Sequence, residues 1–229
     1  MKGKTTYIKS ERTKQFIIEK AAPIFNKKGY AGASFSDIME VTGLSKGCIY
    51  GNFKNKNEIA IEAFRHNLSL SAYGFSLRTL GSELTPLEKL RKLTVGFREI
   101  YEDVMMIGGC PIINTASDTD DTHPQLRKMA QDVVLKIEKG LASVIKEGIA
   151  QGEIKKDTDP GKMTKVIFAL LEGSFLIARL LDNRQYFDSS LDRILEIINE
   201  FSVAPDTEVH VESEQSRTMT AQPDSEKTE

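Results

Sequence analysis

The chain has 229 residues, of which 40% are hydrophobic and 28% charged, and its net charge is −2. This composition is typical of a globular protein with one or two domains. No run of about 18 apolar residues is present and no apolar segment follows the basic start, which argues against a membrane span and against export. The two cysteines, Cys48 and Cys110, have no CxxC spacing, so we expect a cytoplasmic protein without structural disulfides.

Charge is unevenly distributed along the chain. Residues 1–65 contain 12 lysines and arginines against six acidic residues, whereas residues 204–229 contain two against seven. A basic head on an acidic body is suited to binding a polyanion, although chance clustering of exposed charges would give the same totals.

Helical periodicity runs through nearly the whole chain, and strand alternation is almost absent. The first helix is predicted from Ser10 to Lys28, after a flexible basic segment at residues 1–9. Gly29 follows it, and glycine commonly ends a helix because it tolerates a positive φ.

Two short helices come next. Ser34 and Asp37 have the spacing of a capping box at the start of a second helix, and Gly43 would end that helix. Ser45 can cap a third helix of barely two turns that reaches Tyr50.

The longer helices of the body follow. Asn55 would open a fourth helix that runs to Leu80, and Thr85 with the next residue, a proline, would cap a fifth. Further helices are predicted on both sides of a Gly-Gly-Cys-Pro break at residues 108–111, which gives an all-α fold of about nine helices. Residues 204–229 have no aromatic residues and few apolar ones, so we expect a disordered acidic tail there.

The second and third helices, joined by a glycine-containing turn, have the arrangement of a helix-turn-helix. The residues spaced to close a small core with the first helix are Ile38, Val41, Leu44 and Ile49. The short third helix keeps an exposed polar face, and its N-terminus offers free N–H groups suited to phosphate. We therefore expect the head to bind DNA; a helical hairpin that merely packs is the alternative.

The segment Ser45–Glu58, Ser-Lys-Gly-Cys-Ile-Tyr-Gly-Asn-Phe-Lys-Asn-Lys-Asn-Glu, closely resembles the end of the DNA-binding domain of the TetR/AcrR family of transcriptional regulators. Upstream, Ala21–Tyr30 matches the family's Ala-x-x-Leu-Phe-x-x-x-Gly-Tyr pattern, and Asp37-Ile38 matches its Asp-Ile pair. Downstream, Gly109–Thr115 looks like a Gly-Cys-Leu-x-Asn element of some members.

The resemblance implies a three-helix DNA-binding head and a larger helical body that binds a ligand and dimerises. We place the head at residues 10–57 and the body at residues 58–203. The implied function is that of a homodimeric repressor, released from a palindromic operator by a small molecule. A DNA-binding regulator without a small ligand, constitutive or controlled by a partner, is the alternative.

The resemblance also implies which residues touch duplex DNA. They are Ser34, Ser36, Ser45, Lys46, Gly47, Cys48, Tyr50 and Lys56. Lys46 and Cys48 would lie nearest the base edges, Gly47 would allow close approach of the backbone, and the others would contact the DNA backbone. The sequence departs from the family pattern at Cys48, where threonine or serine is usual, and at Gly51-Asn52.

Both cysteines have two interpretations. Cys48 at a helix N-terminus suggests a redox switch, and Cys110 after two glycines suggests a site for an electrophile. A small side chain in a threonine or serine position and a buried inert thiol are the simpler interpretations.

The segment from Val166 to Leu181 is apolar around nearly its whole circumference, interrupted by Glu172 and Arg179. Such a helix must be covered on two sides, either by a partner subunit or, in the alternative, inside a monomer. The resemblance favours a partner, because the last two helices of the family form a dimer interface. The predicted interface residues are Leu170, Ser174, Ile177, Ala178, Leu181, Ile194 and Ile198.

The resemblance places an effector pocket in the body. Its predicted lining residues are Phe75, Phe97, Tyr101, Met105, Ile113 and Phe168, for each of which plain core packing is the alternative. No nucleophile–base set, metal-ligand cluster or phosphate-binding glycine loop is apparent, so we expect no enzymatic activity, no cofactor and no metal site. The acidic loop at residues 118–121 lacks the glycine turn and distal glutamate of a calcium loop.

Overall fold

The computed structural model describes residues 2–119 and 123–203, so the predicted tail lies outside the described residues. Within them the all-α class is confirmed, and the only strand-like pairing is an isolated bridge between Ile154 and Ser202. The helices are α1 (Lys2–Gly32), α2 (Phe35–Thr42), α3 (Lys46–Asn52), α4 (Lys56–Leu70), α5 (Ala72–Leu80), α6 (Pro86–Glu99), α7 (Tyr101–Met106), α8 (Pro111–Thr119), α9 (Pro124–Gln151), α10 (Pro160–Leu180) and α11 (Gln185–Phe201).

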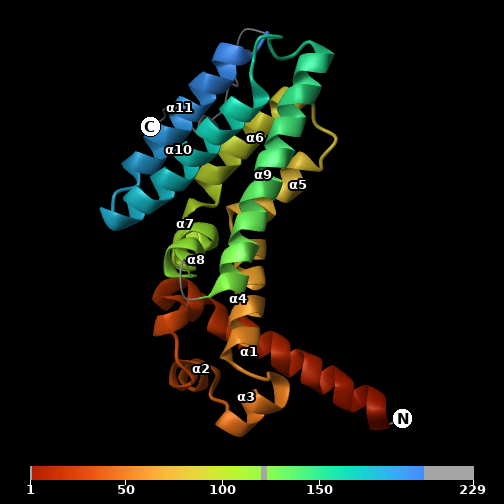
Figure 1. The fold of residues 1–229 in the computed structure, drawn as a ribbon, viewed down its shortest axis with the longest axis vertical. Helices are drawn as coiled ribbons and strands as arrows, with labels where there is room; N and C mark the ends of the chain where they lie inside the picture. Colours follow the sequence, from red (N-terminus) through yellow and green to blue (C-terminus); the bar gives the residue numbers. More distant parts are fainter. Residues whose placement is uncertain (1, 120–122, 204–229) are drawn as a thin grey trace, which may run out of the picture.

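The molecule is elongated, with α1, α2 and α3 at one end and the body at the other (Figure 1). α4 leads from this head into the body. There α6 packs against α9 and α11, and α10 packs against α9 and α11 as well. α1 contacts both α4 and α8, so the head is joined to the body along two routes.

The predicted helix starts are confirmed by their caps. Ser34 with Asp37, and Thr85 with Glu88, form complete capping boxes. Ser45 accepts a hydrogen bond from Cys48 N. Side chains that compete for backbone N–H groups at these positions favour helix initiation, which is why the starts were readable from sequence.

The first helix differs from its prediction at its start. It begins at Lys2, where we expected a flexible segment at residues 1–9; no proline lies in that segment to stop it. At the other end, Gly29 breaks the helical geometry with φ 73° and ψ 173° as expected, and one further turn follows to Gly32.

The continuous fourth helix predicted over residues 55–80 is wrong, because the chain breaks at Ser71. The Ser71 backbone is extended (φ −90°, ψ −179°), and its side chain accepts a hydrogen bond from Tyr73 N and donates one to Leu68 O. The predicted fifth helix likewise divides at Ile100. These two divisions account for eleven helices in the described ranges instead of about nine.

Gly148 of α9 lies at a tight junction with the start of α6 and the segment after α9. A Cβ there would lie 2.6 Å from Cδ1 of Ile154 and 3.2 Å from Cβ of Pro86. Because Ile154 is fully buried, its side chain cannot move aside without disturbing the core. We expect Gly148→Ala to lower the free energy of unfolding by about 1–3 kcal/mol in urea denaturation.

Gly51→Ala is the matched control. Gly51 is exposed on α3, and a Cβ there would have no neighbour within 4 Å. Its stability should be unchanged or slightly higher, because alanine has the better helix propensity. If the two variants were equally stable, the junction around Gly148 would have to be loosely packed.

Candidate DNA-binding surface and ligand cavity

The three helices of the head enclose a small core of their own. Ile17, Ile38 and Ile49, one from each helix, are completely buried. Leu44 is half-buried and packs against this core, but Val41 is 41% exposed. The predicted core is therefore correct except at Val41, and it holds α3 with its polar face outward.

The exposed face of α3 carries most of the predicted DNA contacts. Ser45, Lys46, Gly47 and Tyr50 are exposed, and Cys48 is half-buried. Tyr50 is 44% exposed although its ring stacks on Phe35 of α2 at 4.8 Å between ring centroids. The Lys46 Nζ lies 5.7 Å from the Tyr50 ring centroid, so an aromatic ring and a positive charge share one surface.

The start of α2 adds two exposed serines, Ser34 and Ser36. The Ser34 hydroxyl donates to the Asp37 carboxylate (2.8 Å), which also accepts from Lys28 Nζ (2.7 Å). The hydrogen bond from Lys28 is the main reason why the pKa of Asp37 falls to about 2, followed by the bonds from Ser34. This cluster holds the start of α2 against the end of α1.

Lys56, unlike the predicted contact residues of α3, is engaged in interactions within the protein. Its Nζ donates to the carbonyl oxygens of Tyr30 (2.7 Å) and Ala33 (3.0 Å), and it sits 4.3 Å from the Tyr30 ring centroid. The predicted phosphate contact would require Lys56 to leave these partners. In the structure it ties the start of α4 to the end of α1.

Asn52 has a role that the sequence did not reveal. Its side chain accepts a hydrogen bond from Ser10 Oγ (3.1 Å) and donates one to Cys48 O (2.8 Å). It therefore fixes the last turn of α3 to α1, at a position that the sequence marked only as a departure from the family pattern.

A network of amide side chains joins the head to the body at the turn between α7 and α8. Asn26 of α1 donates through Nδ2 to Ile107 O (2.9 Å) and Gly109 O (3.0 Å). Gly108 and Gly109 have φ values of 102° and 89°, a conformation that favours glycine. The turn thus presents the carbonyl groups of Ile107 and Gly109 to Asn26 of α1.

Asn114 of α8 and Arg179 of α10 complete this network. Asn114 donates to Asn26 O (3.1 Å) and Gly108 O (2.8 Å), while Arg179 donates to Gly108 O and to Asn114 Oδ1 (3.3 Å). We call the side chains of Asn26, Asn114 and Arg179, with the carbonyls of residues 107–109, the head–body joint. It connects α1, α8 and α10 at a single turn.

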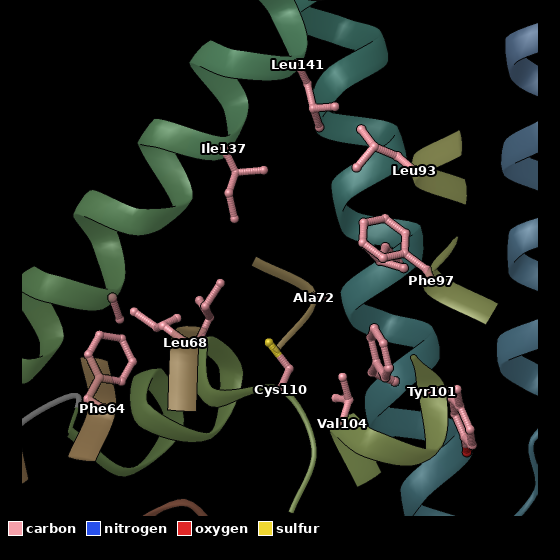
Figure 2. Close-up of a cluster of buried hydrophobic side chains, with 14 of the residues drawn as sticks. Phe64, Leu68, Ala72, Leu93, Phe97, Tyr101, Val104, Cys110, Ile137 and Leu141 are labelled. Atoms are coloured by element: carbon pink, nitrogen blue, oxygen red, sulfur yellow. The ribbon is translucent and has the colours of Figure 1, made fainter. Parts of the chain in front are cut away.

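The body contains a mainly apolar cavity of about 40 Å³. Side chains from α6 and α9, among them Leu93, Phe97, Ile137 and Leu141, point toward it (Figure 2). Cys110, the residue after the Gly-Gly turn, lies on its wall. The cavity has room for a few water molecules, so a larger ligand would have to push its walls apart.

Two of the six predicted pocket residues, Phe97 and Phe168, line this cavity. Phe75, Tyr101, Met105 and Ile113 are not on its wall, and their assignment to an effector pocket stays a prediction. For two of these residues, the direction in which the side chain points from its helix explains why it does not line the cavity. The Phe75 ring packs edge-on against Phe97, and the Tyr101 ring lies against Phe187, 4.7 Å between centroids.

Glu172 of α10 is buried on the wall of the cavity. Its carboxyl group forms a hydrogen bond with the Cys110 thiol, but Oε2 has no hydrogen-bond partner. Burial raises the pKa of Glu172 to about 7 and raises the pKa of the Cys110 thiol as well. A buried thiol of raised pKa is a poor nucleophile, which favours the interpretation of Cys110 as an inert side chain.

The predicted dimer residues fall into two groups. Ile177 and Leu181 are exposed and Leu170 is half-buried. These three side chains are therefore accessible to a partner subunit. The four that their own protomer covers are Ser174, Ala178, Ile194 and Ile198. Those four belong to the protomer core, because their helical phase turns them inward.

Leu176 and Leu180 were missed by the sequence analysis. Both are exposed, Leu180 at 73%, and Tyr186 of α11 is exposed as well. With Ile177 and Leu181 they form an uncovered apolar face, which we call the α10–α11 face. Two apolar pairs at i, i+4 spacing on α10 were the available signal.

No helix among residues 2–119 and 123–203 is both long and apolar enough to cross a membrane. The same residues hold no group of three or more histidine, cysteine, aspartate or glutamate side chains that could bind a metal ion.

Comparisons with known proteins agree with a helix-turn-helix head followed by a helical body. Residues 17–63 match the model of bacterial regulatory proteins of the tetR family, and residues 86–194 match a tetracyclin repressor-like C-terminal domain. The crystal structure of a TetR-family transcriptional regulator from Cytophaga hutchinsonii is 40% identical, with a TM-score of 0.77, and the alignment covers 86% of this chain and 98% of that one.

Two further relatives are similar over most of their length. A TetR transcriptional regulator from Chloroflexus aurantiacus is 31% identical with a TM-score of 0.78, covering 85% of this chain and 98% of that chain. The probable HTH-type transcriptional regulator ArpR of Pseudomonas putida is 28% identical, covering 81% of this chain and 92% of the relative. The chain therefore belongs to the TetR family of transcriptional regulators.

Proposed function

We propose that this chain is a homodimeric repressor that binds a palindromic operator through α3 and leaves it when a small molecule enters the body. Regulators of the TetR family bind DNA, are typically repressors and are not enzymes. The observation that carries the proposal is the exposed polar face of α3, capped by Ser45 and held outward by the buried core of the head. Such a regulator would act in the cytoplasm, where bacterial DNA lies.

The chemistry of the α3 face suits DNA. The free N–H groups at the start of α3 can donate to phosphate, and the Lys46 ammonium adds a positive charge beside them. The operator can be found by selecting bound duplexes from a random library. Two half-sites about 34–36 Å apart, or a multiple of that distance, are expected for a twofold-symmetric protein.

Replacing Lys46 by alanine should weaken DNA binding and flatten its salt dependence. Losing one phosphate contact lowers the slope of log K against log salt by about one. The slope is measured by fluorescence anisotropy on the selected duplex over a range of salt concentrations. Lys146→Ala is the control, because Lys146 is also exposed but lies near the far end of α9. An unchanged slope in Lys46→Ala would count against this surface.

The head–body joint provides a physical route for the coupling between ligand binding and DNA binding. Cys110 lies on the cavity wall and follows Gly109, whose carbonyl accepts from Asn26 of α1. The cavity wall includes residues of α8 and α10, and both helices contribute side chains to the joint, so a ligand that displaces these helices would also move the joint. α4 does not extend as one continuous helix from the head along the cavity, because the chain breaks at Ser71.

The alternative, a regulator without a small ligand, is favoured by the small volume of the cavity, about 40 Å³. The two are separated by titrating a compound that raises the melting temperature, with and without operator DNA. Release requires weaker ligand binding when DNA is present, by the same factor that the ligand weakens DNA binding. If the compound bound equally well with and without operator DNA, the release mechanism would be excluded and the alternative, a regulator without a small ligand, would remain.

A further inference from the structure

We propose that the cavity, once its walls move apart, takes an apolar amine, whose protonated nitrogen pairs with Glu172 while its hydrocarbon part lies among the apolar walls. The proposal names a ligand class, and it depends on the proposed function only for the effect of that ligand on DNA. The geometry behind it is a buried carboxyl group that faces an apolar cavity and has one oxygen without a partner.

A buried carboxyl group is costly unless hydrogen bonds or an opposite charge compensate it. Among the described residues, the Cys110 thiol, a weak donor, is the one side chain that forms a hydrogen bond with Glu172. Among the described residues that line the cavity there is no lysine, arginine or histidine. The described residues of the wall therefore supply no cation to Glu172.

The serine and threonine hydroxyl groups of the wall are already engaged in the helices that carry them. The Ser76 hydroxyl donates to Ala72 O (2.7 Å), and the Thr94 hydroxyl donates to Leu90 O (3.0 Å). Neither hydroxyl is free to satisfy Glu172 without losing its carbonyl partner. Glu172 is thus the group on the wall that most requires a donor from a ligand.

The remaining walls suit a cation with an apolar body. Tyr73, Phe97 and Phe168 line the same cavity, and aromatic faces attract ammonium groups as well as hydrocarbon. An anion would be repelled by the ionised form of Glu172. A neutral alcohol could donate to Oε2 but would bring no opposite charge, so it should bind more weakly than the amine.

Three probes with the same type of phenylalkyl body but different end groups test whether the site prefers a positive charge: 4-phenylbutylamine, 4-phenylbutanol and 4-phenylbutyrate. Calorimetric titration of the full chain should give the amine an affinity at least about tenfold higher than that of the alcohol, with the carboxylate weakest. In Glu172→Gln the amine should lose about tenfold in affinity and its advantage over the alcohol should disappear. Glu172→Leu, which removes the buried polar group, should lose the same preference while keeping the fold.

Glu99→Gln is the matched control, because Glu99 is an exposed carboxylate at the end of α6. The amine preference should be unchanged in that variant. Equal binding of amine and alcohol in the wild-type protein, an amine affinity that survives Glu172→Gln, or no binding of any probe would overturn the proposal. Operator binding is measured separately: an amine that binds at Glu172 without releasing DNA supports this site and contradicts only the release mechanism.

Discussion

Leu180→Glu is expected to convert a dimer into monomers and to reduce operator affinity by about 10²–10⁴-fold. In a dimer, binding of the first head to its half-site holds the second head at a high effective concentration near the other half-site, and a monomer lacks this advantage. Leu180 is 73% exposed in the protomer, so the substitution leaves the protomer core untouched. In the proposed dimer, a glutamate there would be buried without a partner in the α10–α11 face.

The oligomeric state is measured by light scattering at micromolar concentration, and operator affinity by anisotropy. Leu135→Glu provides the matched control, since Leu135 is also an exposed leucine, at 60%, but lies on α9. That variant should remain dimeric and bind DNA normally. A wild-type protein that is already monomeric, or a dimeric Leu180→Glu, would remove the α10–α11 face from the interface.

The helix order could be predicted from sequence because its signals are local. Ser34, Ser45 and Thr85 cap their helices by bonding to backbone groups two or three residues away, and apolar periodicity fills the spans between. The break at Ser71 could not be predicted in this way. A single extended residue interrupts the hydrogen bonds of the helix, but the apolar pattern continues across it with little change of phase.

The sites were harder to predict than the helices because they depend on three-dimensional neighbours. The sequence marked Glu172 only as an interruption in an apolar helix, and its importance comes from which side chains surround it. Asn26 and Asn114 are 88 residues apart and carried no local signal of their contact. The exposed face of α3 was predictable, because the family resemblance is concentrated there.

Asn114→Leu is expected to separate ligand binding from DNA binding. Asn114 bonds to α1 through Asn26 O, to the turn through Gly108 O, and to α10 through Arg179. Leucine has a similar volume but cannot form these bonds, so α1 would lose its hydrogen bonds to Asn114 and keep the bond from Tyr30 N to Asp118 and its packing against α8. We expect the free energy of unfolding to fall by about 1–3 kcal/mol, because buried partners are left without hydrogen bonds.

The decisive measurement is the coupling free energy rather than stability. A compound that raises the melting temperature is titrated with and without operator, and the ratio of its two affinities gives the coupling, typically ~1–3 kcal/mol between an effector and its regulated site. In Asn114→Leu this ratio should approach one, although the cavity and the α3 face are each intact. The head would then no longer respond to the position of α8 and α10.

Asn67→Leu distinguishes a broken connection from general destabilisation. Asn67 of α4 is buried and donates to Ala22 O of α1 at 2.8 Å, so it bonds to α1 as Asn114 does but from α4 and away from the Gly-Gly turn. Its replacement should cost similar stability and keep the coupling. If Asn67→Leu abolished the coupling as completely as Asn114→Leu, the signal would pass through the packing of α1 on α4. If neither variant changed it, the head–body joint would be a purely structural contact.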